Sequence, residues 1–146
     1  MRALGVDLGS RRVGVAVGED RSGLAFPREA LLRASRSAGG RAEDHRRLAA
    51  LAAAEEVDVV VVGLPRSLDG SLGPAARGAL LEVDELRDAL AVPVEVHDER
   101  LTTVAADQAL AGAGVRTRER RSSIDSAAAA VLLESWFATR AAGGAG

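Results

Sequence analysis

The sequence predicts an α/β fold built on a mixed five-stranded sheet, in which an antiparallel meander joins parallel strands and helices flank the sheet. Two observations lead to this expectation. The first part of the chain holds three short β-type runs, at residues 2–8, 13–18 and 24–32. After them, helical and strand patterns alternate, which is typical of parallel strands whose connecting helices cover the sheet.

The first two runs, RALGVDL and VGVAVG, are joined by residues 9–12, which suit the connection of a hairpin. The third run contains Pro27. Because proline has no amide hydrogen to donate to a neighbouring strand, we expect this run at an edge of the sheet.

The remaining elements follow from the spacing of apolar residues. The run VDVVVV has the unbroken apolar character of a parallel strand covered on both faces. Strands are expected at residues 57–65 and 92–99, and helices at 42–56, 74–91, 102–113 and 123–140. Loops are expected at residues 35–41, 66–73 and 114–122, the last of them basic.

Composition favours one domain over residues 1–140, followed by a disordered tail over 141–146. The chain has no cysteine, which excludes disulfides, thiolate metal sites and cysteine nucleophiles. No stretch resembles a signal peptide or a membrane span, so we expect a cytoplasmic protein with no membrane partner. All 19 basic residues are arginine, a residue that binds phosphate bidentately, although a coding bias is the favoured explanation.

Three acidic residues stand at positions that need an explanation. Asp7 interrupts an apolar strand, where an isolated carboxylate is costly to bury, and Gly9 lets the chain turn beside it. Glu99 ends a second central strand, and functional groups gather at the carboxyl ends of parallel strands. Asp125 is expected in the first turn of the last helix, where the alternative is a simple role at the helix dipole.

The small residues of 127–130 would let this last helix approach the sheet and bring Asp125 towards the strand ends. The three acids would then form an all-oxygen site, which favours Mg²⁺ or Mn²⁺. Two such ions can activate water and stabilise the leaving oxygen of a phosphodiester. Strand alternation turns Asp98 away from the face of Glu99, and His97 has either a structural or a proton-transfer role.

Four blocks, VDLGSRRVGVAV, VVGLPRSLDGSLGP, VHDERLTT and IDSAAAAVLLESW, occur in an order and spacing that resemble the YqgF/RuvX family. Members of this family are known as Holliday junction resolvases and as nucleases of pre-16S rRNA. The resemblance spans about residues 3–137 and implies a ribonuclease-H-like fold.

The same resemblance implies that Asp7, Glu99 and Asp125 are the catalytic and metal-binding carboxylates. It also implies that Asp69 and Gly70 support a loop beside the site. Arg11, Arg12 and Arg100 correspond to family positions that hold phosphate or order the acids. Family members often carry lysine just before the last aspartate, where this chain has Arg121-Ser122-Ser123.

A basic cluster precedes Asp125. It consists of Arg116, Arg118, Arg120 and Arg121. We expect these arginines to lie on a flexible loop that binds the backbone of a nucleic acid. Binding should then weaken as the salt concentration rises. The alternative is a solvated charged loop.

The function expected from these features is a metal-dependent nuclease in 5′-end processing of pre-16S rRNA, with the ribosomal particle as a further partner. The alternative substrate is a branched DNA junction. Symmetric junction cleavage needs a dimer, whereas the sequence, which shows no strong apolar patch, suggests a monomer or weak homodimer. A non-catalytic ribosome-assembly or transcription factor remains open. An actin-like ATPase is less favoured because it would need a second domain.

Overall fold

The computed structural model describes residues 1–35, 37–65, 73–98 and 117–144, with the side chains of 117–125 and 143–144 excepted. Its elements, in chain order, are β1 (Arg2–Leu8), β2 (Arg12–Glu19), β3 (Leu24–Leu32), α1 (Ala38–Ala54), β4 (Val59–Leu64), α2 (Pro74–Ala89), β5 (Val94–Asp98) and α4 (Thr117–Gly144). No helix in these segments is long and apolar enough to cross a membrane.

The five strands form one mixed sheet in the order β3-β2-β1-β4-β5. Strands β1, β2 and β3 pair antiparallel, whereas β1, β4 and β5 pair parallel. The predicted meander joined to parallel strands is therefore confirmed, with β1 at the centre. The run that contains Pro27 forms the edge strand β3, as its missing amide hydrogen requires.

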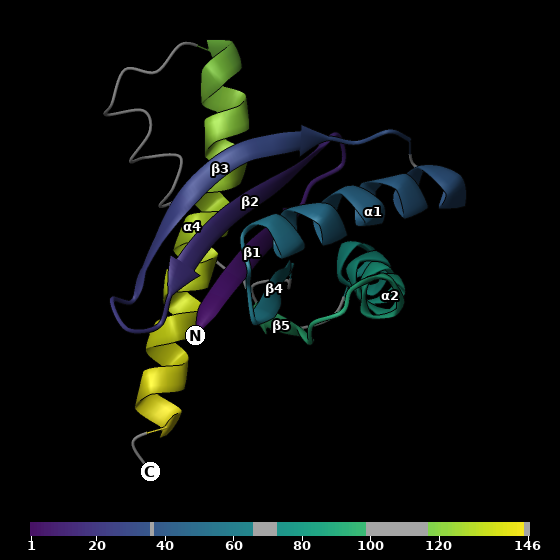
Figure 1. Ribbon diagram of the computed structural model, residues 1–146. Helices are drawn as coiled ribbons and strands as arrows, with labels where there is room; N and C mark the ends of the chain where they lie inside the picture. The colour runs from purple at the N-terminus through teal and green to yellow at the C-terminus, as the bar shows by residue number, and fades with distance from the viewer. Residues whose placement is uncertain (36, 66–72, 99–116, 145–146) are drawn as a thin grey trace.

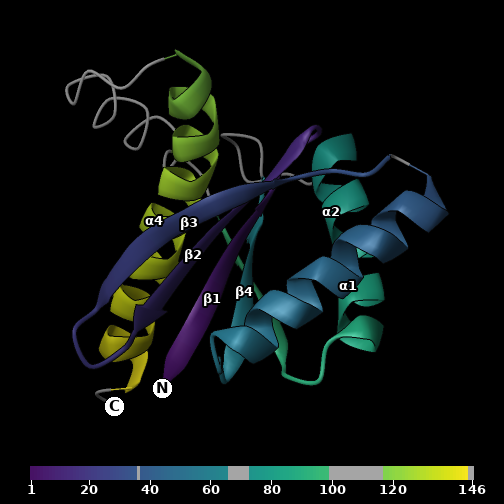
Figure 2. The same ribbon diagram turned by 45° about the horizontal axis from the view of Figure 1, so that its top comes forward.

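Helices cover both faces of the sheet (Figures 1 and 2). On one face, Leu4, Val6 and the even-numbered valines of β4 pack against apolar residues of α1 and α2. On the other face, Ala3 and the odd-numbered valines of β4 pack against α4. The central strands are thus apolar on both sides, which explains their unbroken valine runs.

Helix α4 lies unusually close to β1, and Gly5 is the reason. A Cβ at Gly5 would lie 2.8 Å from the carbonyl oxygen of Ala129 and 3.1 Å from the Cβ of Leu133. The amino end of β1 lies near the carboxyl end of α4 in both views, so strand and helix run in opposite directions (Figures 1 and 2). Residues of β1 that follow Gly5 therefore lie beside residues of α4 that precede Ala129.

Described parts of three segments expected to be irregular are helical instead. Helix α1 begins at Ala38, because the Ser37 side chain accepts a hydrogen bond from the Gly40 amide and caps it. Helix α4 begins at Thr117, within the expected basic loop, and its early residues include arginine and glutamate, which are good helix formers. The same helix runs to Gly144 through the segment expected as a disordered tail.

The close contact at Gly5 gives a prediction about stability. Gly5→Ala would force a methyl group against the α4 backbone, and overpacking of this kind costs about 1–3 kcal/mol. The matched control is Gly78→Ala in α2, where an added Cβ meets nothing within 4 Å. We expect the control to be neutral or to stabilise the protein by roughly 0.5–1 kcal/mol. Urea unfolding of the two variants tests this, and equal effects would contradict it.

Candidate active site

Asp7 lies near the carboxyl end of the central strand β1 and is half-buried. It shares the α4 face of the sheet with Ala3 and Gly5, because side chains alternate along a strand. Its partner on β2 is Gly14. A residue without a side chain therefore lies directly beside Asp7 on this strand.

Strand β4 also has a glycine level with Asp7. Val62 pairs with Val6, so Gly63, the next residue of β4, lies level with Asp7. Gly63 also falls on the face of Val59 and Val61, which is the α4 face. Sequence analysis missed Gly14 and Gly63, since their importance depends on the register between strands.

The turn after Asp7 is tight, as the glycine in the sequence predicted. The Gly9 amide donates to the Asp7 carbonyl at 3.1 Å. A Cβ at Gly9 would lie 2.5 Å from the carbonyl oxygen of Arg12, a distance that backbone atoms cannot relieve cheaply. Gly9 is therefore needed for the chain to return into β2 directly behind Asp7.

The backbone of Asp125 belongs to the part of α4 that packs beside Asp7. The amide of Val15 donates to the Ser126 hydroxyl at 3.4 Å, and Val15 pairs with Val6. The helix begins at Thr117, two turns before Asp125. Asp125 is therefore not in the first turn, and the alternative that it only caps the helix or balances its dipole is wrong.

The remaining predicted acid follows β5. This strand ends at Asp98, which pairs with Leu64, so β5 stops at the same edge of the sheet as β1 and β4. Several predicted site residues lie outside the described part of the chain: Glu99, Arg100, Asp69, Gly70 and Arg116. Among the described side chains, no three histidines, aspartates or glutamates gather in a group that could hold a metal ion.

The two residues before Glu99 have different surroundings. His97 lies on the α4 side, where its Nε2 is 3.0 Å from the Ser135 hydroxyl. Burial lowers the pKa of His97, and the Asp98 carboxylate opposes this shift. His97 thus has a structural partner on α4, and Asp98 shares the strand face of Val94, which is the face opposite Asp7.

The predicted phosphate-binding arginines fall in two places. Arg11 is exposed and Arg12 half-buried in the hairpin that follows Asp7. Arg118, Arg120 and Arg121 lie in the first turns of α4. The expectation that these three belong to a flexible loop is wrong, because the helix already includes them.

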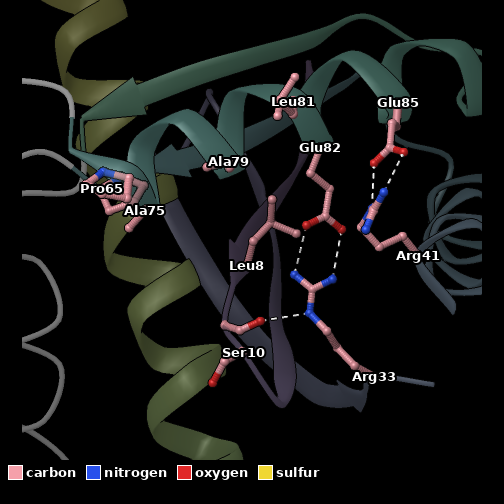
Figure 3. A pocket seen from close by; sticks show the side chains of 13 residues that line it. Leu8, Ser10, Arg33, Arg41, Pro65, Ala75, Ala79, Leu81, Glu82 and Glu85 are labelled. Carbon is pink, nitrogen blue, oxygen red and sulfur yellow. Dashed lines mark hydrogen bonds and ion pairs between the residues drawn. The ribbon is translucent and has the colours of Figure 1, made fainter. Parts of the chain in front are cut away.

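A cavity of about 590 Å³ opens on the other face of the sheet, at the same end of β1 (Figure 3). Its walls include Leu8 and Ser10 beside Asp7, and Pro74 at the start of α2. Two arginine–glutamate pairs line it. They are Arg33 with Glu82, and Arg41 with Glu85.

The Arg33 pair belongs to a buried cluster of charges. The Arg33 guanidinium donates to both carboxylate oxygens of Glu82, at 2.8 and 3.0 Å. His45 Nε2 lies 2.8 Å from Glu82 as well, and Arg33 lies 3.5 Å from Asp44. Burial alone would raise the pKa of Glu82, but the hydrogen bonds from His45 and Arg33 lower it to about 2.

Sequence analysis missed this cluster, in which His45 is only 3% exposed. A signal was available in the helical spacing. His45 shares a helix face with the buried Leu48 and Ala52. In the same way, Glu82 lies beside Val83 and Leu86 on the buried side of α2.

Comparison with known proteins identifies the family to which this site belongs. A family model described as "RuvX: Holliday junction resolvase" matches residues 1–139. The chain belongs to the RuvX family. Two relatives named "Putative pre-16S rRNA nuclease" are similar over almost the whole chain. The protein of Mycobacterium tuberculosis H37Rv is 46% identical, covering 99% of this chain and 83% of the relative. The protein of Anaeromyxobacter dehalogenans is 42% identical, covering 97% of this chain and 99% of the relative.

Solved structures agree on the fold of this RuvX-family chain. A structure of Thermus thermophilus RuvC in complex with a Holliday junction substrate matches with a TM-score of 0.61 at 18% identity, over 97% of this chain and 96% of RuvC. A second structure of the same RuvC matches with a TM-score of 0.56 at 19% identity. The predicted family, the ribonuclease-H-like fold and the nuclease class are therefore confirmed.

The lowered pKa of Glu82 predicts a pH dependence of stability. A depressed carboxyl pKa contributes stability above the unfolded value of 4.5, and this contribution is lost as pH falls towards the folded value of about 2. The shift corresponds to about 3 kcal/mol. We therefore expect the difference in unfolding free energy between the wild type and Glu82→Gln to be largest near pH 6 and to shrink between pH 4.5 and 2.

Glu85→Gln is the matched control, since Glu85 also pairs with an arginine but its side chain is 40% exposed. A surface pair contributes at most about 1 kcal/mol, so its pH dependence should be much smaller. Denaturant unfolding across this pH range gives both curves. Parallel curves for the wild type and Glu82→Gln would contradict the assignment.

Proposed function

We propose that this protein is a metal-dependent nuclease that hydrolyses phosphodiester bonds in 5′-end processing of pre-16S rRNA. The observation that carries the proposal is the placement of Asp7. It lies at the carboxyl end of the central strand, flanked by glycines on both neighbouring strands and by the turn of α4 that contains Asp125. Functional groups in open α/β sheets gather at such an edge.

In this proposal, Asp7, Glu99 and Asp125 hold Mg²⁺ or Mn²⁺, with a two-metal site favoured. Carboxylate oxygens are the ligands that these hard cations prefer. A bound pair of ions supplies an activated water and stabilises the leaving oxygen of the phosphodiester. The glycines at 14 and 63 support the proposal, because neither neighbouring strand projects a side chain beside Asp7.

The proposal assigns the arginines around this edge to the nucleic-acid backbone. Arg11 and Arg12 follow Asp7 directly, and guanidinium groups bind phosphate bidentately. Arg100, Arg116, Arg118, Arg120 and Arg121 complete the proposed contact surface. Asp69 and Gly70 would support a loop beside the site.

RNA is favoured as the substrate by the names of the relatives, which cover almost the full length of this chain. The ribosomal particle as a partner and the cytoplasm as the location follow from that substrate. Holliday junction cleavage is the alternative, supported by the family description and by the RuvC complex. That reaction needs two active sites and hence a dimer, whereas we propose a monomer or weak homodimer.

The central test compares cleavage by the wild type and Asp7→Asn. Each protein is incubated with a labelled precursor-rRNA leader and with a four-way DNA junction, with and without Mn²⁺. We expect metal-dependent cleavage of the RNA by the wild type. The Asp7→Asn variant should lose more than about 100-fold in rate, because it makes a charged metal ligand neutral, whereas groups that only orient such ligands change activity by about 10–100-fold.

The matched control is Asp58→Asn, which makes the same change at an exposed aspartate beside the amino end of β4. Its cleavage rate should stay within about twofold of the wild type. Cleavage of the junction alone would replace the RNA proposal by the alternative. No cleavage of either substrate by folded wild type, and unchanged cellular function of Asp7→Asn, would indicate a non-catalytic assembly or transcription factor.

The arginines of α4 give a second prediction. If Arg118 and Arg120 contact phosphates, their replacement by alanine should reduce the slope of log K against log salt by about 1 per arginine. Binding of the labelled leader at several salt concentrations measures the slope. Arg21→Ala, in the exposed turn between β2 and β3, is the control and should leave it unchanged. A slope unaffected by the Arg118 and Arg120 changes would exclude their role.

A further inference from the structure

We propose that Arg33 is a positioning residue for Asp7, acting through the turn that joins β1 to β2. Arg33 follows the edge strand β3 and is far from Asp7 in the sequence, yet it bonds to the residues on both sides of that turn. This inference rests on the proposed nuclease function, since it assigns to Arg33 the task of holding a catalytic carboxylate in place.

Two hydrogen bonds join Arg33 to the turn. Its Nε donates to the Gly9 carbonyl at 2.7 Å, and its backbone amide donates to the Arg11 carbonyl at 2.9 Å. Gly9 in turn donates its amide to the Asp7 carbonyl. The chain that follows Asp7 is therefore held in place at the carbonyl of Gly9, two residues further on.

The guanidinium that makes this bond is itself fixed in orientation. Its two remaining nitrogens donate to the two oxygens of Glu82, so the fork has one planar arrangement (Figure 3). The side chains of Arg33 and Glu82 are 8% and 10% exposed. His45 anchors Glu82 from α1, at 2.8 Å. The turn is thus connected to the two helices behind the sheet.

Such a cluster is a poor way to gain stability alone. Burying two charges costs desolvation energy that their attraction repays only with good geometry, and apolar replacements are often as stable. The arginine fork instead provides three directed hydrogen bonds in one plane. Lysine, a point charge on a flexible stem, can pair with Glu82 but cannot reproduce the fork.

A small movement of this turn would matter because metal ligands tolerate little displacement. Groups that orient ligands without touching the metal typically change metal affinity or activity by about 10–100-fold when they are removed. The Asp7 carboxylate lies on the opposite face of β1 from Arg33's partners, so Arg33 can act on it only through the backbone.

The test uses Arg33→Lys, which keeps the buried positive charge opposite Glu82. We expect its melting temperature to stay near that of the wild type. Its Kd for Mn²⁺, measured by electron paramagnetic resonance without nucleic acid, should rise about tenfold, and kcat for the precursor-rRNA leader should fall about 10–100-fold. The KM for the leader should change by less than about threefold, since the substrate contacts remain.

The matched control is at Arg2, at the amino end of β1. Arg2 also donates from Nε to a backbone carbonyl, that of Glu55 at 2.6 Å, and pairs with the Glu55 carboxylate. Arg2→Lys should change stability slightly and leave both the Mn²⁺ affinity and kcat within about twofold of the wild type. If Arg33→Lys fails to fold, Arg33→Met combined with Glu82→Gln removes this ion pair, leaves Asp44 as the buried carboxylate of the cluster, and is measured in the same way.

The outcomes separate this inference from the function on which it rests. If Asp7→Asn abolishes cleavage and Mn²⁺ binding while folded Arg33→Lys and the double variant match the wild type, the positioning role is wrong and the nuclease function stands. If Arg33→Lys and Arg2→Lys lose activity equally, the effect is a general loss of stability, and the inference is wrong. If the wild type neither cleaves nor binds Mn²⁺ at Asp7, both proposals are wrong.

Discussion

The close packing of α4 against β1 is the contact on which the arrangement of this site depends. It requires a residue without a side chain at Gly5, because any Cβ there would meet the backbone of Ala129. It also requires the alanines of the helix, two of which, Ala129 and Ala130, are buried against the sheet. Larger residues at either surface would lift the helix from the sheet and move the turn that carries Asp125 away from Asp7.

The opposite face of β1 is held in a different way. There, α1 and α2 pack on large aliphatic side chains near the middle of the sheet, but at the carboxyl end the packing gives way to Arg33, Glu82 and His45. The hydrogen bonds of these charged groups have preferred angles and therefore fix the orientation of the turn. An apolar contact has no preferred angle and could not do so. The carboxyl end of β1 is therefore fixed by close packing on one face and by directed hydrogen bonds on the other.

Much of this architecture could be predicted from the sequence. The unbroken valines of β4, the hairpin at Gly9 and the edge strand with Pro27 each follow from a local property of the chain, and all three are confirmed. Asp7 stood out because a carboxylate is costly in an apolar strand. The start of α4 was placed too late, since the serines at 122 and 123 resemble a cap although the helix is already formed there.

Features that depend on contacts between distant segments could not be predicted in this way. Gly14 and Gly63 matter only because the registers of two strand pairs bring them level with Asp7. Arg33 and Glu82 are 49 residues apart, and each looks like an ordinary surface charge in its own segment. The role of Arg100 was expected from the family resemblance alone, whereas that of Glu99 was expected also from its place at the end of a strand.

The two ends of β1 show what burial adds to the same chemistry. Each end has an arginine whose Nε donates to a backbone carbonyl and whose fork pairs with a glutamate: Arg2 with Glu55, and Arg33 with Glu82. The Arg2 side chain is 33% exposed, so water screens its pair and competes for its hydrogen bonds. The Arg33 side chain is 8% exposed, and its hydrogen bonds are electrostatically stronger because they act in a medium of lower dielectric. The more buried of the two arginine–glutamate pairs is thus at the end of the strand where Asp7 lies, which is the end where a metal site would need a fixed carboxylate.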